Sequence, residues 1–417
     1  MANVTALEWQ GYDPLRRLLS LRRSPLLFAL GALAGYLWLS PVFVAPGLTA
    51  YGSGQSAERV LRVLSVMLIA PIAWKRAVWL VLHDPLLRLV LCAFVIAPSL
   101  SVFSGPGVDF VVATLAPFVI GGLSLLCLCA LKPREFSAWA SGVGAAAVIF
   151  LVLGLSRYGL EMPSFYGRPR AHFGFVHPTQ SASVVIIAGL FLAQASSRMC
   201  RRRRWARGMA VGIICIAAIA LLYLAASRNT LVALLVILVG AVYAVFVRRP
   251  IMRYGAAIAL LLVTCAMYVV AAWGDRQDVL WGMVDEFSSG RMQGYRELTV
   301  DLQQETLFAI LFGPSELMRN REAGFGGFAV IDSVYLTVYL NYGLVTLVSL
   351  FALLFALSRR LSGRRAPLAY GCLCAIIIFF ALDAQGVTPS NLAIFMVLAY
   401  AVRNASPLAI ISGSLRY

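Results

Sequence analysis

The sequence predicts an all-α polytopic membrane protein, with about twelve transmembrane helices in a single membrane domain over residues 1–417. Three observations support this prediction. The chain is 61% hydrophobic and only 13% charged, whereas soluble domains carry about 25% charged residues. Its apolar runs are long enough to cross a bilayer. Its basic residues gather in the short segments between those runs, which is typical of cytoplasmic loops.

Each predicted span is an apolar run bounded by basic residues or by glycine and proline. The first run follows a segment, 1–21, that lacks an apolar core, so we expect no cleavable signal peptide. A polar stretch, 274–330, separates the ninth span from the tenth and is expected to form a partly helical loop. The predicted spans are 25–47, 59–73, 79–103, 110–131, 137–156, 180–197, 208–226, 230–247, 254–273, 331–357, 366–384 and 391–403.

The basic clusters alternate along the chain and predict that both termini are cytoplasmic. The net charge of +17 therefore reflects the excess of basic residues in cytoplasmic loops, so we expect the lipid bilayer as a partner and no nucleic acid. His83, Asp84 and Pro85 interrupt the apolar run from Trp74 to Leu87. The eight cysteines lie in or beside apolar spans, so we expect packing roles for them. Neither they nor the three histidines form a metal-binding pattern, so no metal or other cofactor is expected.

Arginine, without lysine, populates the predicted outer side. Its guanidinium forms paired hydrogen bonds to phosphate that lysine does not match. This composition suits a cavity that binds pyrophosphate, although some of these arginines would simply pair with acids of the long loop. The basic residues outside the cytoplasmic segments are Arg59, Arg62, Arg88, Arg157, Arg168, Arg170, Arg228, Arg276, Arg291, Arg296, Arg319 and Arg321, and all except Arg88 fall on the outer side or its edge.

One outer segment combines charge with other functional groups. The loop 157–179 contains Arg168, Arg170, His172 and His177 among aromatic residues. Arginine supplies positive charge, histidine exchanges protons near neutral pH, and aromatic rings stack on sugars or isoprenoid. These residues are therefore candidates for binding a phosphorylated glycan, and incidental surface positions are the alternative.

Arg228 and Asp332 stand at predicted helix starts. Arg228 lies in a three-residue turn, Ser227–Asn229, at the start of the eighth span. A cation is unfavourable at a helix N-terminus unless an anion lies nearby. That anion is either a lipid headgroup or a substrate phosphate. Asp332 is either the N-cap of the tenth span or a base at the membrane edge. Asp383 is a second carboxylate near the outer end of the eleventh span.

At these residues the sequence resembles the superfamily of O-antigen ligases and O-antigen polymerases, which are bacterial envelope enzymes. The resemblance covers roughly 160–345. It is carried by Gly174–Thr179, Ser227–Asn229, Ser289–Arg291 with Phe312–Gly313, and Asp332–Tyr335 followed by Tyr342–Leu344.

The resemblance implies a GT-C-like fold in the bacterial inner membrane with an active site on the periplasmic face. It implies a metal-independent, inverting glycosyltransferase whose donor and acceptor are undecaprenyl-diphosphate-linked oligosaccharides. Chain-length regulator and export proteins are the further partners it implies. Arg228 and Arg291 correspond to the family's arginines. We expect Asp332 to act on the acceptor hydroxyl and Arg296 and Tyr335 to contact diphosphate or glycan.

Several functions share these features. Ligases of the family usually carry histidine where this chain has Asp332, which favours a polymerase that makes O-antigen, capsule or exopolysaccharide over an O-antigen ligase that uses lipid A core. A lipid-linked oligosaccharide flippase would share the arginines, but it predicts internal repeats and charges deep in several spans. A peptidoglycan glycosyltransferase of the shape and division type would have about ten spans. A scaffold has no use for an arginine-rich face.

Overall fold

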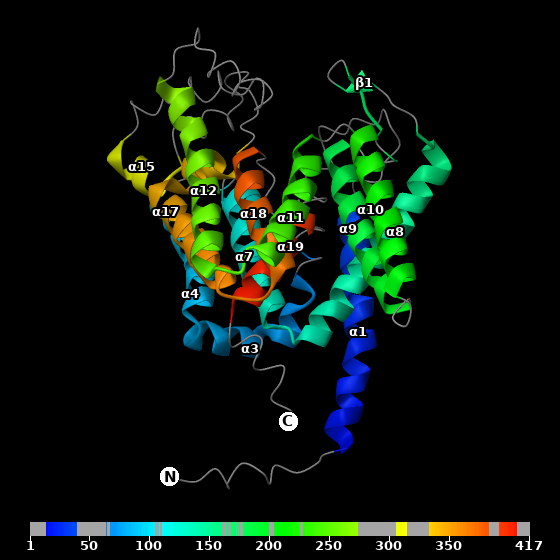
Figure 1. Ribbon diagram of the computed structural model, residues 1–417. Helices are drawn as coiled ribbons and strands as arrows, with labels where there is room; N and C mark the ends of the chain where they lie inside the picture. Colours follow the sequence, from blue (N-terminus) through cyan, green and yellow to red (C-terminus); the bar gives the residue numbers. More distant parts are fainter. Residues whose placement is uncertain are drawn as a thin grey trace.

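The computed structural model describes residues 14–39, 64, 67–104, 108, 111–160, 164–165, 168–171, 173, 175, 178–199, 204–225, 228–273, 306–314, 333–382 and 392–406. Within them the chain is a bundle of helices with one small hairpin, and most helices run nearly parallel to one another (Figure 1). The elements are α1 Pro14–Leu39, α3 Ala70–His83, α4 Pro85–Leu91, η2 Cys92–Ile96, α5 Ala97–Ser99, η3 Leu100–Ser104, η4 Val111–Leu115, α7 Ala116–Ala130, α8 Pro133–Tyr158, β1 Ser164–Phe165, β2 Arg168–Pro169, α9 Pro178–Met199, α10 Arg204–Leu224, α11 Arg228–Phe246, α12 Pro250–Trp273, α15 Leu307–Phe312, α17 Val334–Ser362, α18 Pro367–Leu382 and α19 Leu392–Ala405.

Three of the described helical segments are long and apolar enough to cross a membrane. They are Pro85–Ser104, Pro133–Tyr158 and Val334–Ser362. Shorter apolar helices, including Gly208–Leu224 and Thr230–Phe246, accompany them. The predicted class, an all-α membrane protein, is therefore confirmed.

The predicted boundary between the second and third spans is wrong. Lys75 and Arg76 were assigned to a cytoplasmic loop, but both lie inside α3, which crosses the lower end of the bundle (Figure 1). Most of the predicted span 59–73 lies outside the described residues. The next helix, α4, begins at Pro85, because the Asp84 carboxylate accepts a hydrogen bond from Leu86 N at 2.9 Å and caps it.

Small residues let pairs of helices approach closely. On α1, Gly31 and Gly35 face α8, and a methyl group added to Gly31 would overlap the carbonyl oxygen of Trp139. Gly142 on α8 is held equally close to Phe28 on α1. In a membrane, where water does not drive helices together, close contact of this kind is a main source of helix association. The spacing of these glycines thus fixes the α1–α8 pair.

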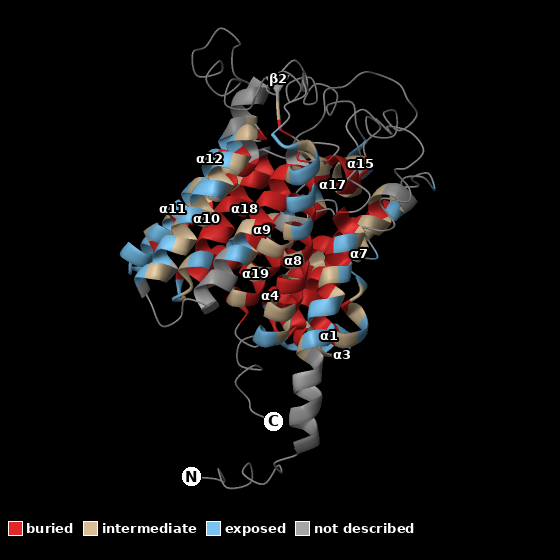
Figure 2. Ribbon diagram, turned by 90° about the vertical axis from the view of Figure 1, so that its right-hand side faces the viewer, coloured by how far each residue is buried: buried red, intermediate tan, exposed pale blue. Residues whose placement is uncertain are grey.

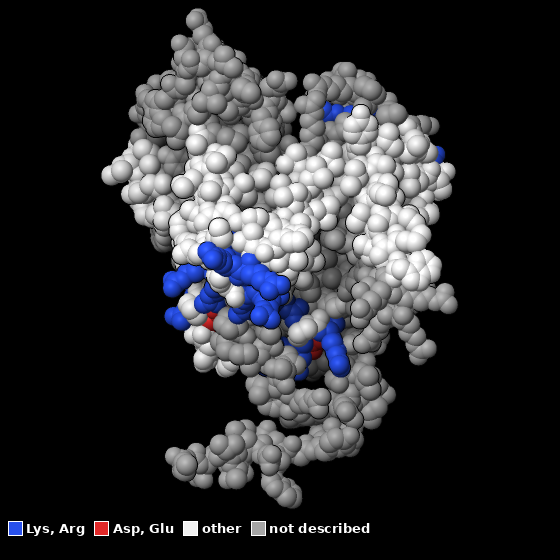
Figure 3. Space-filling model, in the orientation of Figure 1, with Lys and Arg blue, Asp and Glu red and all other residues white. Residues whose placement is uncertain are grey.

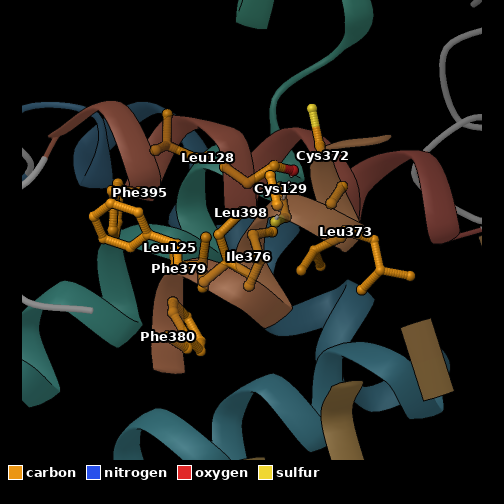
Figure 4. Close-up of a cluster of buried hydrophobic side chains, with 14 of the residues drawn as sticks. Leu125, Leu128, Cys129, Cys372, Leu373, Ile376, Phe379, Phe380, Phe395 and Leu398 are labelled. Carbon is orange, nitrogen blue, oxygen red and sulfur yellow. Dashed lines mark hydrogen bonds between the residues drawn. The ribbon is translucent and has the colours of Figure 1, made fainter. Parts of the chain in front are cut away.

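The core between α7, α18 and α19 consists of aliphatic, aromatic and cysteine side chains (Figure 4). Cys129 on α7 and Cys372 on α18 are buried and free of disulfide bonds. Their predicted role in packing is thereby confirmed. Figure 2 shows that buried residues fill the bundle and exposed ones lie on its outside.

One end of the bundle, called here the basic end, carries most of the described cations (Figure 3). Asp84, which is 1% exposed, accepts hydrogen bonds there from Arg360 on α17 at 2.9 Å and from Ser406. Arg359 and Arg360 belong to the last turn of α17, which runs past its predicted end at 357. The cations of this end whose side chains the structure describes are Lys75, Arg76, Arg88, Lys132, Arg134, Arg248, Arg249, Arg253, Arg359, Arg360, Arg364, Arg365 and Arg403.

Candidate functional site

The end opposite the basic end, called here the distal end, is where α8, α10, α12 and α18 finish and where α11 and α17 begin (Figure 1). The predicted site residues fall at this end wherever the structure describes them. Four contacts between distant parts of the sequence define it.

The first contact joins the loop between α8 and α9 to the end of α10. Ala171 donates a backbone hydrogen bond to Leu224 O at 2.9 Å. Ala171, Phe173 and Phe175 are buried, so the loop returns into the protein after the β1–β2 hairpin. Arg168 lies in β2, and Arg170 is half-buried immediately before the anchored Ala171. The loop arginines are therefore held close to the turn that precedes Arg228.

The second contact sets the level of Arg228, the first residue of α11. This helix packs antiparallel on α18, where a methyl group added to Gly371 would overlap Ile237 O. Nine residues separate Ile237 from Arg228, and nine separate Gly371 from Phe380. At a rise of 1.5 Å per residue, both lie roughly 13 Å from that contact toward the distal end. The backbone of Arg228 is thus level with the last turn of α18.

The third contact joins the last turn of α18 to the start of α17. Ser333 Oγ donates to Phe380 O at 3.3 Å, and Tyr268 OH donates to Ala381 O at 3.1 Å. The two hydroxyl oxygens are 2.5 Å apart. These side chains satisfy carbonyl groups that have no partner within α18, because the last four carbonyls of a helix lack one. Ser333 is consequently fixed by α12 and α18 together.

Ser333 also corrects the predicted cap of the tenth span. Its hydroxyl accepts a hydrogen bond from Leu336 N at 3.4 Å, and its extended backbone is that of an N-cap. Asp332 was the predicted cap, but α17 starts at Val334 and Ser333 performs that role. Asp332 itself lies outside the described residues. Its alternative role, as a base, stays a prediction.

Tyr335 is placed within the protein. It is 2% exposed, its hydroxyl donates to Ile377 O at 3.2 Å, and its ring stacks on Phe351 with centroids 5.1 Å apart. This environment ties α17 to α18. The substrate contact predicted for Tyr335 stays a prediction. The burial of its side chain does not favour such a contact.

The fourth contact joins the long loop to a break in α17. Gly343 has φ 76° and ψ 178° inside that helix, and a methyl group added to it would overlap Leu311 O. Gly313, with φ 58°, lies equally close to the break, because a methyl group there would be 2.6 Å from Asn341 O. Both conformations are open almost only to glycine. The motifs around Phe312–Gly313 and Tyr342–Leu344, far apart in sequence, are thus in backbone contact.

This loop contains one described helix, α15, as its apolar periodicity predicted. Thr306 caps α15 by accepting from Ala309 N at 3.3 Å. The remaining predicted loop residues, Arg291 and Arg296, lie outside the described residues, as do His172 and His177. For Arg168 and Arg228 the structure describes the backbone alone.

The described side chains of the distal end include two cations, Arg157 and Arg170. Among the described residues the acidic ones are Asp84 and Glu135, and both lie at the basic end. Arg157 is exposed at the end of α8, with its guanidinium 5.5 Å from the ring centroid of Tyr158. No three histidine, cysteine or acidic residues gather as a metal site within the described chain. Cationic groups on a rigid helical frame suit an anionic ligand such as a diphosphate.

Sequence reasoning missed the contributions of Tyr268, Ser333 and Leu224. A tyrosine hydroxyl within an apolar run was the available signal for Tyr268, since buried hydroxyls need partners. Nothing in the sequence pointed to Leu224, whose backbone carbonyl makes the contact. Comparisons of the chain with models of known protein families, with curated proteins and with solved structures find no match.

Proposed function

We propose that this protein is a GT-C-like glycosyltransferase that polymerises undecaprenyl-diphosphate-linked oligosaccharide repeat units into a surface polysaccharide. The observation that supports it most is the gathering of four separate motifs at the distal end: the anchored arginine loop, the start of α11, the start of α17 and the glycine contact at Gly343. An enzyme that handles a lipid diphosphate needs such positive groups at the edge of the membrane.

The distribution of basic residues supports the orientation. Cytoplasmic loops of membrane proteins carry an excess of lysine and arginine. The basic end therefore faces the cytoplasm in this proposal, and the distal end faces the periplasm across the bacterial inner membrane. The repeat units are used on that side, where their diphosphate lies at the level of the headgroups.

The proposed reaction is a single displacement. The acceptor hydroxyl oxygen attacks the anomeric carbon of the donor sugar, and the bond from that carbon to the diphosphate oxygen breaks. The electron pair remains on the diphosphate, whose charge Arg228 and Arg291 neutralise, and the hydroxyl proton passes to Asp332. The configuration at the anomeric carbon is inverted. The groups proposed to hold diphosphate and glycan are Arg168, Arg170, His172, His177 and Arg296.

Arg228 provides the first test. Arg228→Lys keeps the charge but loses the paired hydrogen bonds, so it should reduce polymerisation of a purified lipid-linked repeat by about 100-fold, as Arg228→Ala does. Arg248→Lys, at the basic end, is the matched control and should retain activity. Full activity of Arg228→Lys would remove Arg228 from the diphosphate site.

Asp332 provides the second test. Since Ser333 is the cap, a substitution at Asp332 tests its chemical role without removing the cap of α17. The two variants are Asp332→Asn and Asp332→Ala. Both should keep the thermal stability of the wild type and still bind the donor, while turnover is lost. If Asp332→Asn turns over normally, the base must be sought at His172, His177 or Asp383, or no base is needed.

The lipopolysaccharide of a deletion strain distinguishes a polymerase from a ligase. In a deletion strain, surface lipopolysaccharide with single repeat units supports a polymerase. Bare core with accumulated lipid-linked polymer would identify an O-antigen ligase instead. Unprocessed repeat units trapped at the cytoplasmic face would identify a flippase.

A further inference from the structure

The helix α3 differs from its neighbours in direction. It runs across the lower end of the bundle, where it packs against α7 and α4 (Figure 1). Its 14 residues extend roughly 21 Å, which is too short for a hydrocarbon core of about 30 Å. It ends at Asp84, where the extended backbone and Pro85 turn the chain into α4.

The two faces of α3 have different environments. Ala73, Ala77 and Leu80 are buried against the bundle. The opposite face exposes four large apolar side chains, and a patch of this kind on a surface indicates an interaction site. These are Trp74, 48% exposed, Val78, 41%, Trp79, 45%, and Leu82, 67%.

One exposed cation lies on this apolar face, and two more lie at the start of α8. Lys75 is exposed one turn before Trp79, and its aliphatic stem can follow apolar surface while the ammonium group reaches outward. Lys132 and Arg134 are exposed at the start of α8, directly after the α7 helix against which α3 packs. The imidazole ring of His83 stacks on Trp79, with ring centroids 4.5 Å apart.

The described acids of this end are engaged within the protein. Asp84 pairs with Arg360 at 2.9 Å. Glu135 accepts a hydrogen bond from Lys132 N at 2.8 Å. Burial lowers the pKa of Arg76, and the negative charge of Glu135 opposes part of that shift. The exposed cations around α3 therefore face outward without an exposed acid among the described residues.

We propose that α3 is an in-plane membrane anchor that binds anionic phospholipid in the leaflet at the basic end. Tryptophan favours the boundary between headgroups and acyl chains, and an amphipathic helix lies there with its apolar face inward. Trp74, Trp79 and Leu82 enter that boundary. Lys75, Lys132 and Arg134 contact the phosphates of anionic headgroups.

The first experiment tests the depth of α3. The protein is reconstituted with phospholipid brominated near the headgroup end of its acyl chains, and quenching of tryptophan fluorescence is measured. The quenched fraction should fall in a Trp74→Phe, Trp79→Phe variant, which keeps an apolar surface. It should not fall in Trp139→Phe, because Trp139 is fully buried. An unchanged quenched fraction in the double variant would overturn the anchor.

The second experiment tests the preference for anionic headgroups. Native mass spectrometry measures retention of phosphatidylglycerol and phosphatidylcholine by the detergent-solubilised protein. Each basic residue near anionic lipid contributes about fivefold to the affinity. A variant with both Lys75→Glu and Lys132→Glu should therefore bind phosphatidylglycerol about 25-fold more weakly than the wild type. The matched control, Arg248→Glu with Arg249→Glu, changes the same charge on another exposed segment of the basic end and should bind nearly as the wild type. Equal losses in both variants, or equal retention of the two lipids by the wild type, would overturn the proposal.

Discussion

Replacing Gly343 by alanine tests the contact between the long loop and α17. In the structure Gly343 interrupts that helix with φ 76° and ψ 178°, and the backbone of Leu311 occupies the space that a side chain would need. Alanine has two ways to respond. It either keeps the strained backbone and pushes Leu311 away, or it adopts helical angles and straightens α17. Both responses displace the segment Leu307–Gly313.

The expected loss in the free energy of docking α15 on α17 is the sum of two contributions. A residue with a side chain in this region of φ and ψ costs about 1–3 kcal/mol. Overlap with a neighbouring backbone that must shift costs about 1–3 kcal/mol more. The docking of α15 on α17 should therefore weaken by about 2–6 kcal/mol. Even the lower bound corresponds to roughly 30-fold in the equilibrium for local opening.

Amide hydrogen exchange in detergent micelles measures this opening. Peptides that cover α15 should exchange at least about 30-fold faster in Gly343→Ala than in the wild type. The matched control is Gly255→Ala on α12, where an added methyl group meets nothing within 4 Å, and it should leave α15 unchanged. Equal exchange in Gly343→Ala and the wild type would refute the contact between the two glycine motifs.

Three further predictions concern the ends of the bundle. Arg360→Ala leaves the buried Asp84 carboxylate without its cation and should lower the free energy of unfolding by about 3 kcal/mol in thermal scans. Arg359→Ala, at an exposed position, is the control and should have little effect. Equal stabilities of these two variants would contradict the pairing of Arg360 with Asp84. Ser333→Ala removes the cap of α17 and should lower that free energy by about 1–2 kcal/mol in the same scans, and a neutral effect would show that Ser333 is not the cap. For the orientation, cysteine placed at exposed Leu160 should react with an impermeant thiol reagent added from the periplasm and cysteine at exposed Arg365 should not; the reverse labelling would invert the proposed topology.

Apolar run length and the positions of basic residues predicted the helices of this chain well. Helices such as α8, α11 and α12 fall where the runs of 137–156, 230–247 and 254–273 placed them. In lipid, a spanning segment must be apolar and must pair its backbone groups within itself as a helix. Each such helix can therefore be recognised from its own residues alone. The segment 70–83 was misassigned because Lys75 and Arg76 indicated a loop between two spans, whereas both lie inside α3.

The sequence by itself therefore determined the class of protein, the helices and which residues carry unusual charge. It also placed Arg228 at the start of a helix, which the structure confirms. Only the tertiary structure decided that Ala171 binds Leu224, that Ser333 caps α17 on the end of α18, and that Gly313 meets the break at Gly343. Those contacts join backbone carbonyls and residues far apart along the chain. Backbone groups are the same at every position, so their partners are set by how the helices pack in space and leave no mark in the local sequence.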